Sequence, residues 1–71
     1  MNLEWVDGFV IKTEINKNEI VIKANKEGLL SLANHLQKMA QDEILSGYHI
    51  HLDDSNSLED ESVSLIIQKL A

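Results

Sequence analysis

The chain has 71 residues, of which 44% are hydrophobic and 25% charged, and its net charge is −6. This length fits a single domain, expected to span residues 1–71, and the composition is that of a soluble globular protein. The lack of cysteine excludes a disulfide scaffold, and the acidic charge argues against nucleic-acid binding, which needs basic residues at the phosphates.

The first residues do not resemble a targeting segment. They include the acids Glu4 and Asp7 and no basic residue, whereas a secretory signal peptide begins with positive charge. No apolar run approaches the roughly 18–20 residues of a membrane span. We therefore expect a cytoplasmic protein that does not contact a membrane.

Two alternating runs in the first third of the chain predict a β-hairpin. Residues 8–15 and 19–25 each alternate apolar and polar side chains, as strands do. The turn signal between them is Asn16-Lys17-Asn18, because asparagine tolerates the left-handed backbone conformation. The apolar phase consists of Phe9, Ile11, Ile15, Ile20, Ile22 and Ala24.

The first strand has an open N-terminal boundary. Leu3 and Trp5 share its phase, so it could begin near the N-terminus, with Gly8 as a bulge or break. Trp5 is either a core residue packed near Phe9 or an exposed interface anchor. In so small a protein the core position is favoured.

A helix is predicted over about residues 26–43. Asn25 can cap its N-terminus, and Glu27 is a favourable charge in its first turn. Apolar residues follow helical spacing and form one stripe that requires a sheet to cover it. This stripe comprises Leu29, Leu32, Ala33, Leu36, Met39 and Ala40.

Two sequence patterns in the C-terminal part of the chain predict two more strands. Gly47 breaks the chain before the alternating run from Tyr48 to Asp53, and a polar loop follows. The β-branched residues between Val63 and Leu70 favour a strand, with a short C-terminal helix as the alternative. The predicted fold is therefore α+β with the order ββαββ: one antiparallel four-stranded sheet with a single helix packed on one face.

A single helix would leave the other face of that sheet uncovered. The outward phase includes apolar and histidine side chains, so this face could form a dimer or partner interface. Ordinary surface exposure is the alternative. The outward residues are Val10, Lys12, Val21, Lys23, His49, His51 and Ile66.

The acidic charge is confined to one part of the chain. Residues 1–39 carry equal numbers of acids and lysines, so the whole excess lies in residues 40–71. Such a patch can steer a basic partner protein, although acidic loops also simply keep a small protein soluble. The densest cluster comprises Asp53, Asp54, Glu59, Asp60 and Glu61.

The sequence has few residues in arrangements typical of catalysis or metal binding. His49, His51 and Asp53 alternate along one strand, which could bring two imidazoles to one zinc ion. However, only His35 remains as a further histidine, and so short a chain has little room for a substrate cleft. No phosphate loop or catalytic triad is recognisable. We therefore expect no enzyme activity, no metal and no cofactor, and His49 and His51 are better candidates for partner contacts.

Two segments resemble the Immunity protein 32 family of bacterial polymorphic-toxin systems. The first is the run from Glu19 to Leu36, which contains the motif Asn-x-Glu-Gly-Leu at the helix start. The second is Gly-x-His-x-His-Leu-Asp at residues 47–53, and the pattern continues to the last strand. The resemblance covers about residues 19–70. Asp54 stands where many relatives are expected to have proline, and residues 55–57 lack an expected glycine.

The resemblance implies a cytosolic antidote that binds and neutralises a cognate toxin domain. An acidic antidote suits a nuclease toxin, because complementary charge raises the association rate. The expected partner-binding residues are Asp53, Asp54, Glu59, Asp60, Glu61, His49 and His51. The alternatives are a non-enzymatic homodimer pairing through the open sheet face and a metal-dependent protein using the strand histidines.

Overall fold

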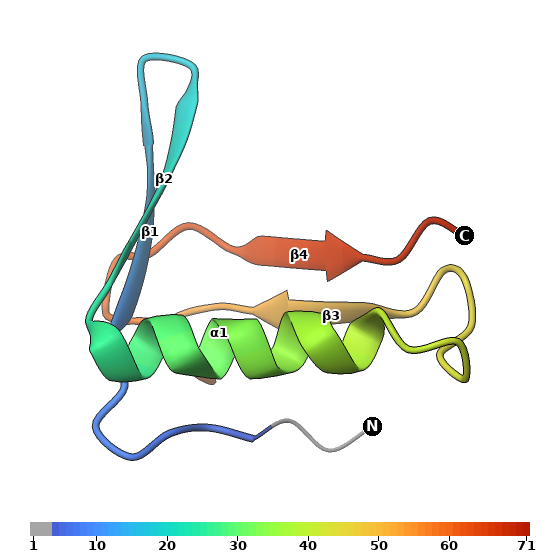
Figure 1. Cartoon of the computed structure of the whole chain (residues 1–71). Coiled ribbons are helices and arrows are strands. Elements are labelled where there is room, and N and C mark those ends of the chain that lie inside the picture. Colours follow the sequence, from blue (N-terminus) through green and yellow to red (C-terminus); the bar gives the residue numbers. More distant parts are fainter. Residues whose placement is uncertain (1–3) are drawn as a thin grey trace.

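The computed structural model describes residues 4–71 and shows four strands and one helix in the predicted order (Figure 1). The elements are β1 (Ile11–Asn16), β2 (Glu19–Ala24), α1 (Lys26–Met39), β3 (His49–Leu52) and β4 (Leu65–Gln68). The C-terminal segment is thus a strand, not the alternative helix. Within the described residues, α1 lacks the length and apolar character needed to cross a bilayer.

The predicted hairpin is confirmed. β1 and β2 pair in antiparallel register from Ile11 opposite Ala24 to Asn16 opposite Glu19. The two turn residues, Lys17 and Asn18, have φ values of 50° and 70°, which is the left-handed pattern of a type I′ turn. The right-handed twist of such turns matches that of the strands, which explains why so short a loop suffices.

The prediction of one four-stranded sheet is wrong. β1 pairs with β2, β3 pairs with β4, and the two pairs form separate two-stranded sheets. The free edge of β1 is occupied by residues 59–63 instead of by a strand. Glu59 N–H donates to Ile11 O at 2.9 Å and Val63 N–H donates to Thr13 O at 3.1 Å. Three positions of β1 thus face five residues of the segment, a mismatch that no regular ladder can accommodate.

The start of α1 is fixed by one asparagine, as predicted. The Asn25 Oδ1 atom accepts hydrogen bonds from Gly28 N–H at 2.7 Å and Val10 N–H at 3.0 Å. The Asn25 Nδ2 atom donates to Gly8 O at 2.9 Å. Asn25 therefore caps the helix and joins it to the segment before β1.

The helix ends at Met39, four residues before the predicted end. Asp42 and Glu43 follow, and acids are unfavourable at the negative end of the helix dipole. Lys69 holds the chain after the helix instead: its Nζ donates to Gln41 O at 2.6 Å and Ile44 O at 2.8 Å.

The helix buries a different face from the predicted apolar stripe. Met39 of the stripe is buried and Leu32 is partly buried, but Leu29 and Leu36 are 58% and 48% exposed. The helix is turned about its axis so that the small residues Gly28 and Ser31 face inward, because they let the helix approach the hairpin closely. The buried helix residues are Gly28, Ser31, His35 and Met39.

The core is small and lies between α1 and the inner face of the β3–β4 sheet. Its buried apolar residues are Ile11, Met39, Ile50, Leu52 and Leu58. Trp5 packs partly buried against this core, stacked on Phe9 with ring centroids 4.6 Å apart. The favoured core position of Trp5 is thus confirmed, and Leu3 lies outside the described residues. Gly8 (φ 84°) lies in a turn, so β1 begins after it.

The β1–β2 hairpin projects away from the layer formed by α1, β3 and β4 (Figure 1). The predicted single outer face is therefore split between two sheets. The outer half of the hairpin is not covered by the core: Ile15 is 66% exposed, Ile20 72% and Ile22 44%. These isoleucines were predicted to face the helix, but the helix covers only the base of the hairpin.

Candidate functional site

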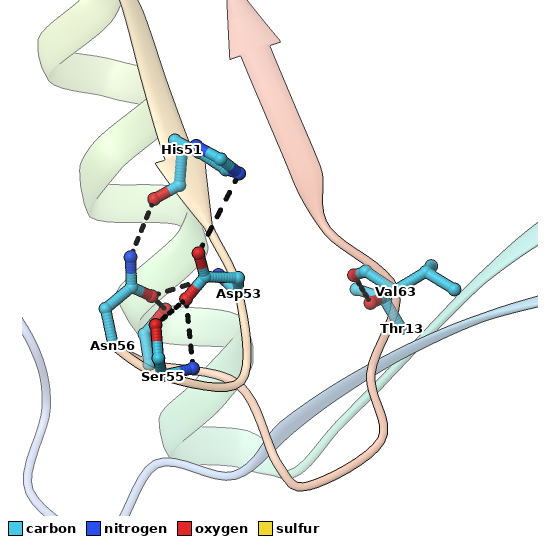
Figure 2. A network of polar contacts seen from close by, with 7 residues as sticks. Thr13, His51, Asp53, Ser55, Asn56 and Val63 are labelled. Carbon is cyan, nitrogen blue, oxygen red and sulfur yellow. Dashed lines mark hydrogen bonds and ion pairs between the residues drawn. The ribbon is translucent and has the colours of Figure 1, made fainter.

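The predicted acidic residues lie in two consecutive turns between β3 and β4, which we call the acidic loop, residues 53–61. The first turn is closed by its backbone, since Ser57 and Leu58 N–H donate to Asp53 O at 3.1 and 2.9 Å. Side chains close it a second time, as Figure 2 shows. Asn56 Nδ2 donates to His51 O at 2.9 Å, and its Oδ1 accepts from Asp53 N–H at 3.0 Å.

The Asp53 carboxylate takes part in this closure. Its Oδ1 accepts hydrogen bonds from the Ser55 hydroxyl at 2.7 Å and from Ser55 N–H at 2.9 Å. The Ser55 hydroxyl, then the Ser55 backbone, lower the pKa of Asp53 below its usual value, and nearby His51 and the Asn56 backbone add to this against slight desolvation. Asp53 therefore shapes the loop, and only 25% of its side chain is exposed.

The second turn is fixed to the edge of β1. Ser62 N–H donates to Glu59 O at 3.1 Å, and the Ser62 hydroxyl accepts from Thr13 N–H at 3.2 Å. The buried Thr13 hydroxyl donates to Val63 O. Glu61 has a φ of 68°, a left-handed conformation that lets the chain turn back toward β4. The acidic loop is thus held at both ends.

Four acidic side chains of the loop are exposed and carry unbalanced charge. Among residues 4–71, none of them is within 4.0 Å of a basic nitrogen. Lys69 is the one lysine in the last 32 residues, and its ammonium is engaged by Gln41 and Ile44 carbonyls. The four acids are Asp54, Glu59, Asp60 and Glu61. Their negative field therefore reaches solvent largely uncompensated.

The two strand histidines lie beside the loop on the outer side of β3. His51 is directly adjacent, with its Nε2 atom 3.8 Å from Asp53 Oδ2 and its side chain 53% exposed. His49 lies two residues further away, and its Nδ1 is 3.4 Å from Gly47 O. The structure thus brings His51 and Asp53 together, whereas His49 extends the same exposed row toward the other end of the strand.

Neither a metal centre nor a substrate cleft is evident in the described residues. Within residues 4–71, no three histidine, cysteine or acidic residues are placed to hold one ion. An apolar depression of about 210 Å³ lies between the end of α1 and β4. It is smaller than typical small-molecule sites, and its lining is mainly apolar. The lining includes Leu36, Met39, Ala40 and Ile67.

The residues that rigidify the acidic loop were not identified from the sequence. Four residues hold the loop: Ser55, Asn56, Ser62 and Thr13. Only Ser55 and Asn56 lie in a local sequence pattern from which their role could be predicted. Aspartate followed by serine two residues later is a typical Asx-turn, which would have predicted the Asp53–Ser55 hydrogen bonds. The Thr13–Ser62 contact joins residues 49 apart in sequence, and no local pattern could predict it.

Comparison with known proteins gives one family. The sequence model described as Immunity protein 32 matches residues 19–70, which is most of the chain. No curated protein and no solved structure gives a significant match. The match begins at β2 and includes α1, β3, the acidic loop and β4.

Proposed function

Because the chain belongs to the Immunity protein 32 family, we propose that it binds and neutralises a cognate bacterial toxin domain through its acidic loop. The family supports an immunity role in general. The observation that carries the finer proposal is a set of four exposed acids, on a loop anchored at both ends, that form no ion pair with residues 4–71. A loop held in this way loses little conformational freedom on binding.

The charge of the loop favours a nuclease as the toxin. A nuclease must hold phosphates, and the lysines and arginines that do so form a basic surface. The acidic loop complements such a surface, so electrostatic attraction would speed the encounter and bring the antidote to the substrate-binding region. His51, half-exposed beside the loop, and His49 would contact the toxin at the edge of the same interface.

In this proposal the protein acts by occupying a surface and not by catalysis. Asp53 has a positioning role, because its carboxylate is engaged by Ser55, and the flanking acids meet the toxin. The proposed place of action is the cytoplasm, where an immunity protein would meet a toxin before it reaches its target.

Association kinetics with the toxin domain encoded beside this gene test the proposal. The chain offers a matched pair of variants, since Asp-Glu occurs both at 60–61 and at 42–43, outside the loop. We expect Asp60→Asn/Glu61→Gln to slow association about three- to tenfold at low salt, with less effect at high salt. Asp42→Asn/Glu43→Gln makes the same change in net charge and is the control.

Equal association rates for the two double variants would contradict the acidic loop as the steering surface. A toxin domain without nuclease activity that still binds through the loop would contradict only the nuclease assignment. Complete lack of binding at either salt concentration would reject the encoded pair as cognate partners.

A further inference from the structure

The free edge of β2 is a strand edge without a partner in the described residues. The register of the hairpin directs the backbone N–H and C=O groups of Ile11, Thr13 and Ile15 away from β2. On β1 these outward groups of Ile11 and Thr13 form hydrogen bonds with residues 59–63. On β2 the corresponding outward groups belong to Ile20 and Ile22, and no described residue bonds them. Proteins usually protect such an edge.

The side chains around this edge are apolar and exposed. Ile15, Ile20 and Ile22 lie on one face of the hairpin, where Ile15 is directly opposite Ile20. Their exposed fractions are 66%, 72% and 44%. A charged or proline-containing edge would resist pairing, whereas on this face the edge combines open hydrogen-bonding groups with isoleucine, and the charged Glu19 and Lys23 lie on the other face.

The whole chain exposes more surface than a closed monomer of its mass. Its accessible surface is 5095 Å², against about 4,500 Å² expected for a folded 8.0 kDa monomer. The radius of gyration is 12.4 Å, against roughly 11 Å expected for a compact chain of this length. The excess of about 600 Å² approaches the roughly 800 Å² that each partner buries in a standard interface.

We propose that β2 pairs antiparallel with β2 of a second copy of this chain, which joins the two hairpins into one four-stranded sheet. Val21 lies on the two-fold axis, Ile20 pairs with Ile22 of the second copy, and Glu19 lies opposite Lys23 of the second copy. This register satisfies the outward backbone groups of Ile20 and Ile22.

Charge complementarity selects this register and this partner. Glu19 and Lys23 are placed symmetrically about Val21, so each strand carries the complement of its own charges. Shifting the pairing by one repeat in either direction places Lys23 opposite Val21 or Lys17 and loses both ion pairs. Within one chain Lys23 lies opposite Lys12, an unfavourable pair only partly offset by the 2.9 Å contact with Glu14. Glu19 of a second copy would relieve it.

The same register joins the exposed isoleucines into one apolar strip. Ile15 and Ile20 of one copy continue into Ile22 of the other, and the two-fold axis repeats the row. This dimer uses a sheet edge, unlike the sheet-face homodimer considered from the sequence. It leaves the acidic loop free, because that loop lies along β1, at the opposite edge of the hairpin. The dimer is therefore independent of the proposed toxin contact.

Sedimentation velocity of the purified chain alone, from about 1 to 200 μM, tests the dimer. We expect a reversible monomer–dimer equilibrium in the micromolar range. Glu19→Lys should weaken it at least tenfold, because it sets like charges opposite Lys23, and Lys23→Glu should weaken it likewise. Mixing these two variants should restore dimerisation, since the mixed pair has opposite charges at both positions. Glu43→Lys, an exposed change outside the hairpin, should behave as the unchanged chain.

Cysteine crosslinking tests the register, since the natural chain has no cysteine. Val21→Cys should form a disulfide-linked dimer on mild oxidation, because Val21 would meet itself across a close, non-hydrogen-bonded pair. Lys23→Cys on the same strand face should not, because its two copies would lie about four residues apart along the strands, roughly 13 Å.

A chain that is monomeric throughout this range overturns the proposal, and so does a dimer that Lys23→Cys traps as readily as Val21→Cys. Failure of the mixed charge variants to associate would also overturn it, provided that circular dichroism shows both to be folded. A β2 edge that becomes protected from hydrogen exchange only when toxin domain is added would assign the edge to the toxin instead.

Discussion

Replacing Gly28 with alanine should destabilise the protein, although alanine is the better helix former. A Cβ atom at this position would lie 2.5 Å from Val10 O, 2.9 Å from Ile11 Cγ1 and 3.1 Å from Ala24 Cβ. The nearest atom is a backbone oxygen whose own position is fixed by a hydrogen bond from Asn25 N–H. The helix would have to move away from the hairpin to relieve the overlap.

The size of the effect follows from two opposing terms. The 2.5 Å approach is about 1 Å inside the usual contact distance, and overpacking costs about 1–3 kcal/mol. The upper half of that range, about 2–3 kcal/mol, applies because the overlapped atom is a backbone oxygen that cannot move aside as a flexible side chain would. The gain in helix propensity from glycine to alanine is at most about 1 kcal/mol. Gly28→Ala should therefore lower the free energy of unfolding by about 1–2 kcal/mol, and the melting temperature by roughly 5–15 °C.

Urea denaturation followed by Trp5 fluorescence and by far-UV circular dichroism measures this change. One low protein concentration should be used throughout, since any association would add to the apparent stability. Ala33→Gly, at an exposed helix position, is the matched reverse substitution and should cost about 1 kcal/mol through propensity alone. Both variants should thus be destabilised. A Gly28→Ala variant as stable as the natural chain, or more stable, would refute the close helix–hairpin contact.

Two further predictions concern side chains that hold the same region. Asn25→Ala should lower the free energy of unfolding by about 2–3 kcal/mol in urea denaturation, because a cap and two loop hydrogen bonds are lost, whereas Asn25→Asp keeps the acceptor and should cost less. His35 is fully buried, and neither ring nitrogen has a hydrogen-bond partner among residues 4–71. Its ring and the Trp5 ring are nearly perpendicular, with centroids 4.3 Å apart. Burial is the main cause that lowers the pKa of His35, and the charge of Lys38 lowers it further. The nearby Glu4 backbone, which forms no hydrogen bond of normal geometry with the ring, opposes the shift in part. Since the folded-state pKa lies below the unfolded value near 6.5, stability is full above that pH and falls as the pH drops below it, by at most about 1.4 kcal/mol per pH unit. His35→Phe should flatten this decline below about pH 6.5, and an unchanged pH dependence would contradict the assignment.

Local signals predicted the elements well because each has a local cause. Asn25 caps α1 with its own side chain, and the turn of the hairpin has left-handed Lys17 and Asn18, of which Asn18 is the type of residue that permits this conformation. The alternation in β3 also places Ile50 and Leu52 in the core, as the strand period requires. These features depend on residues within a few positions of one another.

Features set by distant contacts were predicted wrongly. Whether the four strands form one sheet depends on what occupies the edge of β1, and that is decided by hydrogen bonds to residues 59–63. The buried face of α1 depends on the close approach at Gly28 and on Ser31. The Ser31 hydroxyl donates to Glu27 O and accepts from Val6 N–H, both at 2.8 Å. A hydrophobic stripe alone does not reveal such polar anchoring.

The family motif has a clear structural meaning in this fold. Its residues at the helix start, Asn25 and Gly28, form the cap and the close packing contact, and Asp53 at the end of the second motif closes the first turn of the acidic loop. In this structure these three residues hold the scaffold. Among the described residues, the side chains of the exposed acids between Asp54 and Glu61 do not shape the loop in this way. Only the backbone of Glu59 and the left-handed turn at Glu61 contribute to its structure. Their side chains can therefore change while the loop keeps its shape, which suits the proposed contact with a toxin.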